Sequence, residues 1–371
     1  MTKMGMVSLN IQKPCPQFVL GFLLINAYIP GILGASLQTG WLFLLITLPL
    51  VMFQLNIDIK YPHIYGGMFI AYSALSFIWT LNFDLALYVF LQTIALALIF
   101  CIGACVKDIR WFIIGLAVGL LPSDVIGTIQ YFYHVSPVIT LKNTPAGLFV
   151  NQNIFCEVSA SILISLVVLK LWVYIPFTLP GIIYVHSRGA LLSIAIGVCL
   201  IIFRYSKKLF YWSLVGIFPL GFLIYHHQFS LKSIQERFSV WADTINGINL
   251  FGNGVGSFAV MYPYYATHVD TSRARPYYAH NDILQAVYEY GIGSIFFLIF
   301  LFLILRIKND KITILLSILT MAMFNSSLHN PTIGFIWFMV AGFVTRDMPS
   351  IRDIGNNRGS YLFNGFTTER T

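Results

Sequence analysis

The chain has 371 residues, of which 58% are hydrophobic and only 10% are charged, and its mean hydropathy is +0.79. Soluble domains carry about 25% charged residues, so this composition excludes a soluble globular protein and indicates an integral membrane protein. The net charge of +8 comes from scattered residues and not from a basic block, which argues against nucleic acid as a partner.

The apolar runs are long and uninterrupted, which favours membrane-spanning helices over the weakly alternating strands of a β-barrel. We predict an all-α, polytopic membrane protein of about twelve spans, with residues 1–371 forming a single membrane domain. The seventh and eighth predicted spans are short and almost without a loop between them, and the seventh contains two prolines. In chain order the predicted spans are 17–35, 40–57, 63–80, 85–106, 111–131, 153–170, 171–186, 188–203, 209–226, 283–305, 312–328 and 331–345.

The positions of lysine and arginine predict the orientation, because cytoplasmic loops of membrane proteins are enriched in both. With the N-terminus inside, the inner segments carry 16 of these residues and the outer segments carry 6. Both termini are therefore predicted to be cytoplasmic, with 346–371 as a short polar tail. The long loop 227–282, between the ninth and tenth spans, then faces outward.

No motif for a metal or a cofactor is present: the chain has no DxD-type acidic pair, no HExxH and no Cys/His cluster, so we predict neither. The cysteines lie in or beside apolar segments and form no CxxC pair, and we interpret them as small packing residues. They are Cys15, Cys101, Cys105, Cys156 and Cys199.

Polar residues cluster at the outer ends of the predicted spans. They come from LFVNQNIFCEV, from YVHSRGALL, from the long loop, from the HND that opens the tenth span, and from SSLHNPTIGF. Because all of them fall on one face of the membrane, we predict a functional site there. Its candidate residues are Asn151, Asn153, Glu157, His186, Ser187, Arg188, Arg237, Trp241, Arg273, Arg275, His280, Asn281, Asp282, His329 and Asn330.

Taken singly, these residues also have structural explanations. Arg188 suits an interfacial arginine that extends toward the headgroups. His280 suits an ordinary helix-capping residue, and Asn281 or Asp282 suits the N-cap of the tenth span.

Two acidic residues and one glycine motif have similar alternatives. Glu157 and Glu289 are candidate buried partners of the arginines. GNGVGSF, at 252–258, looks like a phosphate-binding loop, but no strand precedes it, and a tight re-entrant turn is the better interpretation.

The chemistry of the candidate site favours a phosphorylated lipid substrate. The guanidinium fork pairs bidentately with phosphate, and a neutral histidine can take a proton from a hydroxyl near neutral pH. A metal-free transfer to a hydroxyl, with a phosphate leaving group held by arginines, fits these residues.

As a set, the motifs GLFVNQNIF, SRGALL, ERFSVWADTINGINLFGNGVGSF, HNDILQAVYEYGIGS and LHNPTIGFIWF resemble the O-antigen ligase and polymerase superfamily over about residues 147–340. The resemblance implies a GT-C-like enzyme of the bacterial inner membrane. It would take a glycan from undecaprenyl pyrophosphate at the periplasmic face, with inversion at the anomeric carbon. The sequence departs from many relatives in one place, where it reads NQN and they have NPN.

Carried over residue by residue, the resemblance implies His280 as the general base, and Arg188 and Arg237 as ligands of the donor pyrophosphate. The remaining polar candidates would support them.

Three reactions of the superfamily stay open: ligation to lipid A–core, polymerisation onto a second lipid-linked glycan, and transfer to a protein serine or threonine. We favour the ligase, and the short tail argues against the protein-directed reaction. A transporter or flippase is the alternative from another class, since Asp124, Glu157 and Glu289 would suit a proton-coupled carrier.

Overall fold

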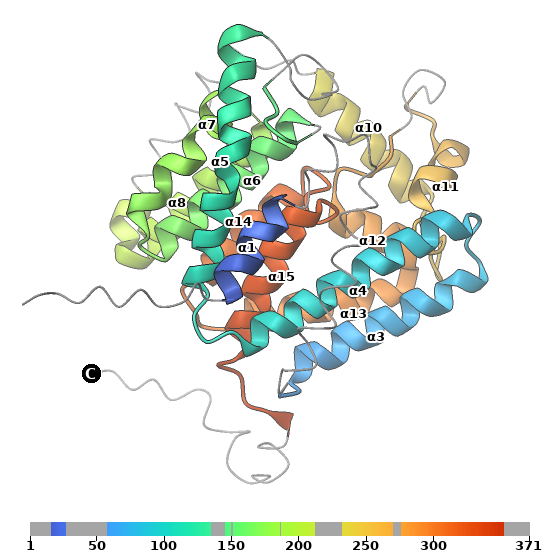
Figure 1. Ribbon diagram of the computed structural model, residues 1–371. Helices are drawn as coiled ribbons and strands as arrows, with labels where there is room; N and C mark the ends of the chain where they lie inside the picture. Colours follow the sequence, from blue (N-terminus) through green and yellow to red (C-terminus); the bar gives the residue numbers. More distant parts are fainter. Residues whose placement is uncertain are drawn as a thin grey trace, which may run out of the picture.

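The computed structural model describes residues 16–26, 58–134, 145–149, 151–185, 187–211, 232–269 and 276–351, and every regular element in these ranges is a helix (Figure 1). Four helices are long and apolar enough to cross a membrane, and they match the predicted fourth, fifth, eighth and tenth spans. The all-helical architecture is thus confirmed for the described residues, with four candidate membrane spans. The four are α4 (Phe83–Cys105), α5 (Arg110–Tyr133), α8 (Arg188–Tyr205) and the run of α12, a 3₁₀ turn and α13 (Asp282–Leu305).

Shorter helices account for most of the other predicted spans. The second predicted span and nearly all of the ninth lie outside the described residues, so the count of twelve stays a prediction. The shorter helices are α1 (Pro16–Asn26), α3 (Tyr61–Leu75) with the 3₁₀ turn η2 (Ser76–Ile78), α6 (Gln152–Val168), α14 (Ile312–Ala322) and α15 (Pro331–Thr345).

The predicted seventh span, 171–186, is a short and irregular element. It consists of the 3₁₀ helix η3 (Trp172–Thr178), which contains Pro176, followed by α7 (Leu179–Ile183). Proline removes a backbone donor and clashes with the preceding turn of an α-helix, which accounts for the 3₁₀ geometry.

Helices α14 and α15 lie at the centre of the bundle. α14 packs against α6 and α8, and α15 packs against α4 (Figure 1). The close approach of α4 and α15 depends on glycine, because a Cβ atom at Gly103 would overlap the carbonyl of Met339, and one at Gly342 would overlap that of Phe100. Small residues at helix contacts are typical of membrane bundles.

The loops assigned above to the cytoplasmic side contact one another at one end of the bundle. Lys60 Nζ donates to the carbonyl of Thr345 at 2.8 Å, and Arg346 Nη1 donates to the backbone carbonyl of Lys107 at 3.1 Å. Arg204 pairs with Asp310 at 2.7 Å. These contacts agree with a shared side for the loops, and which side of the membrane that is stays a prediction.

The long loop before the tenth span is folded where the structure describes it. It contains α10 (Lys232–Asn246) and α11 (Phe258–Tyr265), which pack beside α12 (Asp282–Tyr290; Figure 1). Asp243 is fully buried there and accepts hydrogen bonds from Tyr262 and from the 267–268 turn, including one of 2.6 Å from the His268 ring. Burial opposes ionisation, yet the bonds from His268 and Thr267 lower the pKa of Asp243 to about 2.

The glycine motif 252–258 is a tight turn, as predicted, and not a phosphate loop. Gly252, Gly254 and Gly256 have φ angles of +78°, +95° and +67°, which glycine adopts without strain. The turn docks where the predicted tenth span is interrupted by the 3₁₀ turn η4 (Gly291–Gly293), before α13 (Ser294–Leu305).

Candidate functional site

Asn325 is the centre of a polar cluster at the end of the bundle opposite the basic loops. It follows α14 and donates from Nδ2 to Oε1 of Glu157 on α6. The other carboxylate oxygen of Glu157 accepts from Ser327 at 3.0 Å, and Ser187 lies 3.4 Å from Oε1. Glu157 is 3% exposed, so these donors satisfy a buried carboxylate.

Two arginines meet at this cluster. Arg237 on α10 donates from Nη2 to Oδ1 of Asn325 at 3.1 Å. Burial lowers the pKa of Arg237; the charge of Glu157 opposes this shift and that of Arg188 adds to it. Arg188 and Arg237 therefore lie close enough to interact, and Glu157 is the carboxylate that acts on Arg237. An excess of positive charge on two half-buried guanidinium groups suits an anion.

The N-terminus of α8 also favours an anion at this cluster. Arg188 is its first residue, and the N-cap Ser187 makes no side-chain capping bond, because its hydroxyl faces Glu157. The backbone N–H groups of a helix N-terminus attract anions. The Cα of Gly189 approaches the cluster closely, since a Cβ there would lie 3.6 Å from both Asn325 and Glu157.

His280 contacts the same cluster from the end of the long loop, two residues before α12 begins. Asn325 hydrogen-bonds its ring, and the charge of Arg237 acts on it. The second ring atom, Nδ1, is buried without a hydrogen-bond partner in the part of the chain that the structure describes. His280 has a φ of 55°, which is uncommon for a residue other than glycine and has to be held by its surroundings.

His280 is neutral in this environment. Burial first, and the charge of Arg237 second, lower its pKa to about 4, although the hydrogen bond to Asn325 acts in the other direction. At neutral pH the imidazole is therefore in its basic form, and Nδ1, which has no hydrogen-bond partner among the described residues, can accept a proton from a hydroxyl.

The residues flanking His280 fix its position. Trp241 donates from Nε1 to the carbonyl of Ala279 at 2.9 Å, and the Ala279 N–H donates to Oε1 of Gln285 at 3.1 Å. On the other side, Asn281 caps α12, accepting from Leu284 N at 2.9 Å. The capping role suggested for Asn281 is confirmed, while His280 itself is not the cap.

Asp282 and His329 form a second network, next to the first. His329 Nδ1 lies 2.6 Å from Oδ1 of Asp282, and Leu328 N donates to Oδ2 at 2.7 Å. Although burial opposes it, the charge and hydrogen bond of Asp282 raise the pKa of His329. Asp282 therefore accepts hydrogen bonds from the turn before α15, and it is not the N-cap of α12.

Glu289 has no arginine partner among the described residues; Arg273 and Arg275 lie outside them, so its pairing with an arginine stays a prediction. Its carboxylate accepts from Gly256 N at 3.0 Å and from Gln285 Nε2 at 3.1 Å, within the glycine turn. Glu157, in contrast, is near Arg237, as the alternative suggested.

Asn151 and Asn153 belong to the start of α6. Asn151 is the N-cap and accepts from Asn153 N at 2.8 Å. Gln152 is the first helical residue, a position at which proline is also favoured. Reading NQN in place of NPN therefore leaves the helix start intact.

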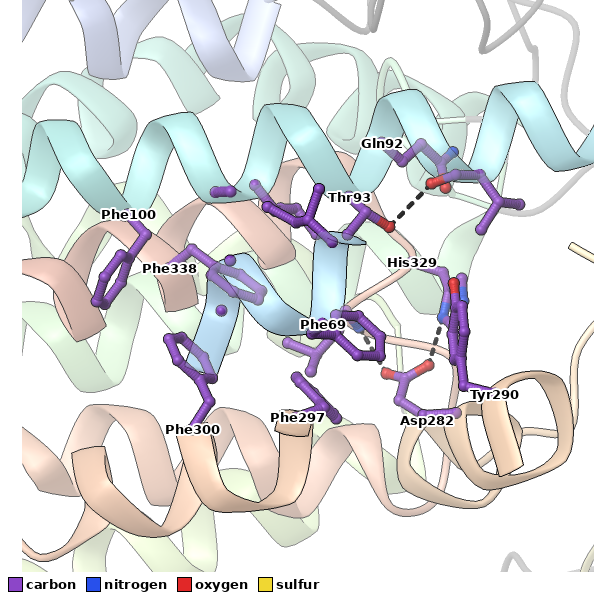
Figure 2. A pocket seen from close by; sticks show the side chains of 18 of the residues that line it. Phe69, Gln92, Thr93, Phe100, Asp282, Tyr290, Phe297, Phe300, His329 and Phe338 are labelled. Atoms are coloured by element: carbon purple, nitrogen blue, oxygen red, sulfur yellow. Dashed lines mark hydrogen bonds and ion pairs between the residues drawn. The ribbon is translucent and has the colours of Figure 1, made fainter. Parts of the chain in front are cut away.

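An apolar cavity of about 320 Å³ lies beside the second network (Figure 2). Asp282 and His329 mark its polar end, and rings from α3, α4, α13 and α15 line the rest, among them Phe69, Phe300 and Phe338 (Figure 2). Gly67 on α3 widens it, because a Cβ atom there would meet no atom within 4 Å.

Three predicted residues cannot be placed relative to the site, and two others have roles elsewhere. His186, Arg273 and Arg275 lie outside the described residues. Asn330 is the N-cap of α15. Asp124 is buried in α5, and its carboxyl oxygens have no hydrogen-bond partner among the described residues. Within the described ranges, no group of three or more His, Cys, Asp or Glu is placed to hold a metal ion.

Sequence reasoning missed Asn325, Ser327 and Gln285. The first two stand in MFNSSLH at the end of an apolar run, and three consecutive polar residues there are a usable signal. Gln285 lies between Asp282 and Glu289 at i, i+3 and i+7, which places all three on one face of a helix.

One family model matches part of the chain. Residues 173–298, about a third of the chain, match the family model described as O-antigen ligase. The match supports membership of the O-antigen ligase family. The matched region contains Arg188, Arg237 and His280, while Glu157 and Asn325 lie outside it. No curated protein sequence matches the chain. Members of the O-antigen ligase family are glycosyltransferase-like ligases and polymerases, with lipid-linked glycans as their substrates.

Proposed function

We propose that the protein is a glycosyltransferase of the bacterial inner membrane. It transfers a glycan from undecaprenyl pyrophosphate to an acceptor hydroxyl at the periplasmic face, without a metal ion. The acceptor we favour is lipid A–core, so the reaction is O-antigen ligation in lipopolysaccharide biosynthesis. A second lipid-linked glycan, as in a polymerase, is the alternative. The observation that carries the proposal is that Arg237 and a neutral His280 share one partner, Asn325, with Arg188 close by.

In the proposed reaction the acceptor oxygen attacks the anomeric carbon on the side opposite the pyrophosphate. The hydroxyl proton moves to His280, the carbon–oxygen bond to the pyrophosphate breaks, and the bond's electron pair leaves with the pyrophosphate. Attack from the opposite side inverts the configuration, and no covalent intermediate with the enzyme forms. Proton removal by a positioned base contributes about 10²–10⁴-fold to such a rate.

Arg188, Arg237 and the start of α8 hold the departing pyrophosphate. Their charges act on an oxygen that becomes more negative in the transition state, so they stabilise it more than the ground state. Glu157 and Asn325 keep the Arg237 guanidinium in place between turnovers.

The apolar cavity gives the lipid part of the substrate a place to bind. Its lining is predominantly aromatic and aliphatic, and its polar end is formed by Asp282, two sequence positions from His280. A lipid chain in the cavity would bring its headgroup to the level of His280.

A reconstituted assay tests the proposal. Purified protein in vesicles receives a polyprenyl-pyrophosphate glycan and, in separate tubes, lipid A–core, excess donor alone, or a serine- and threonine-containing peptide. A product on lipid A–core supports the ligase, a lengthened lipid-linked glycan supports the polymerase, and a glycopeptide supports the protein-directed reaction. Movement of donor across the vesicle without a new glycosidic bond would favour the transporter and refute a transferase.

A further inference from the structure

One face of α12 holds three segments by hydrogen bonds: the turn before α15, the glycine turn 252–258 and the residues just before His280. Asp282, Gln285 and Glu289 share this face and are each at most 3% exposed. Asp282 holds the turn before α15, through His329 and Leu328. Glu289 holds the glycine turn through the N–H groups of Gly256 and Phe258, at 3.0 Å and 3.4 Å.

Gln285 lies between the other two and is bonded to each system. Its Oε1 accepts from the N–H of Ala279, and its Nε2 donates to Glu289 at 3.1 Å. The same Nε2 lies 3.4 Å from Nε2 of His329. Because Ala279 requires an acceptor and Glu289 a donor, these contacts fix which way the amide points.

We infer that Gln285 is a positioning residue for His280. Ala279, the residue before His280, is held at both backbone groups: at its N–H by Gln285 and at its carbonyl by Trp241. His280 itself has the unusual φ of 55°, and this conformation lasts only if its neighbours enforce it. Gln285 enforces it from within the bundle and Trp241 from the side of α10.

The chemistry explains why this position needs an amide. A carboxylate would accept from Ala279 but would add charge next to Glu289, and an aliphatic side chain would leave the buried Ala279 N–H without an acceptor. Leaving a buried donor unsatisfied is unfavourable, so the loop would move to satisfy it. A shift of about 1 Å in a catalytic group can lower a rate by about a hundredfold.

The inference rests on the proposed function, in which His280 is the base, and the experiment separates the two. Transfer is measured at varied donor concentration and pH for the wild type, Gln285→Met, Trp241→Phe and His280→Gln. Gln130→Met is the matched control, since Gln130 is also a buried glutamine that accepts from loop N–H groups, at Ala146 and Gly147, away from His280. The amount of folded protein is measured for each variant.

Gln285→Met is expected to lower kcat by about ten- to a hundredfold with the donor KM unchanged, because the arginines are untouched. The acid limb of its kcat/KM profile should move to higher pH, since a loosened His280 loses part of the burial that lowers its pKa. Trp241→Phe keeps an aromatic ring beside Phe238 and Phe324 but loses the bond to Ala279, and should show the same signature even if Gln285→Met fails to fold.

Wild-type kcat and an unmoved acid limb in the folded variants would overturn the inference, provided that His280→Gln is inactive. The inference is equally overturned if Gln130→Met lowers kcat and moves the acid limb to the same extent. Activity of His280→Gln would instead refute the base itself, and the positioning role with it.

Discussion

The side-chain oxygen of Asn325 accepts a hydrogen bond from Nη2 of Arg237 at 3.1 Å. The two residues are 88 positions apart in the sequence. Through Asn325 the arginine is connected to Glu157 and to His280, so one neutral amide links the anion-binding and proton-accepting parts of the proposed site.

Asn325→Leu should therefore reduce transfer more than a single lost hydrogen bond would. It removes the hydrogen bonds that Glu157, Arg237 and His280 each make with Asn325, and a buried polar group left unsatisfied costs about 1–3 kcal/mol. We expect the rate to fall by about ten- to a hundredfold. Ser326→Ala is the control, because the neighbouring Ser326 hydroxyl is buried without a hydrogen-bond partner among the described residues. Equal rates for the two variants, measured per folded molecule, would contradict the linking role.

Arg188→Lys and Arg237→Lys should both be poor enzymes. An ammonium group cannot reproduce the bidentate fork, and losing a charge-assisted contact to phosphate costs about 1.5–3 kcal/mol, or about ten- to a hundredfold and more in rate. Arg204→Lys is the matched control at the opposite end of the bundle, where Arg204 pairs with Asp310. The measurement is the steady-state transfer rate of the three variants. Full activity in Arg188→Lys and Arg237→Lys would exclude the phosphate-binding role of these arginines.

Much of this site could be predicted from the sequence, for a physical reason. Spans alternate in direction, so a residue's distance from a span end and the sign of the flanking charges fix which face it reaches. That was enough to bring Glu157, Arg188, Arg237 and His280 together.

The hydrogen-bond partners could not be predicted in the same way. Asn325 and Gln285 are uncharged, and their roles depend on contacts between segments that are distant in sequence. The interruption at Gly291 was missed because an apolar run has no periodicity that marks a break, and only the docked glycine turn explains it. The tight turn at 252–258, in contrast, followed from glycine spacing alone.

The pH dependence of the reaction distinguishes the free from the bound enzyme. The imidazole must be unprotonated to act as a base, and its pKa in the free protein is lowered to about 4. We expect kcat/KM to stay constant as the pH falls through the ordinary imidazole range near 6.5 and to decline only near pH 4. The acid limb of kcat should lie higher, because bound pyrophosphate favours the protonated ring. A kcat/KM limb at about pH 6.5 or above would contradict the burial of His280.

Filling the apolar cavity should weaken donor binding. Gly67→Leu places a side chain where a Cβ meets no atom within 4 Å, so the variant should fold normally. If the lipid chain binds in the cavity, the donor KM should rise severalfold with kcat less affected. Met68→Leu, at an adjacent position that is 41% exposed, is the control. An unchanged donor KM in Gly67→Leu would place the lipid chain elsewhere.

The turnover of His280→Gln beside His280→Ala in the reconstituted transfer assay decides whether His280 is the general base. Glutamine keeps a hydrogen-bonding side chain for Asn325 but cannot take the hydroxyl proton. We predict that both variants fold and bind donor, and that both lose about 10²–10⁴-fold in kcat. His268→Gln, which alters a histidine bonded to Asp243 in the same outer loop, should keep the wild-type rate. Near wild-type turnover by His280→Gln would show that His280 is not the base, and His329 would become the candidate to test.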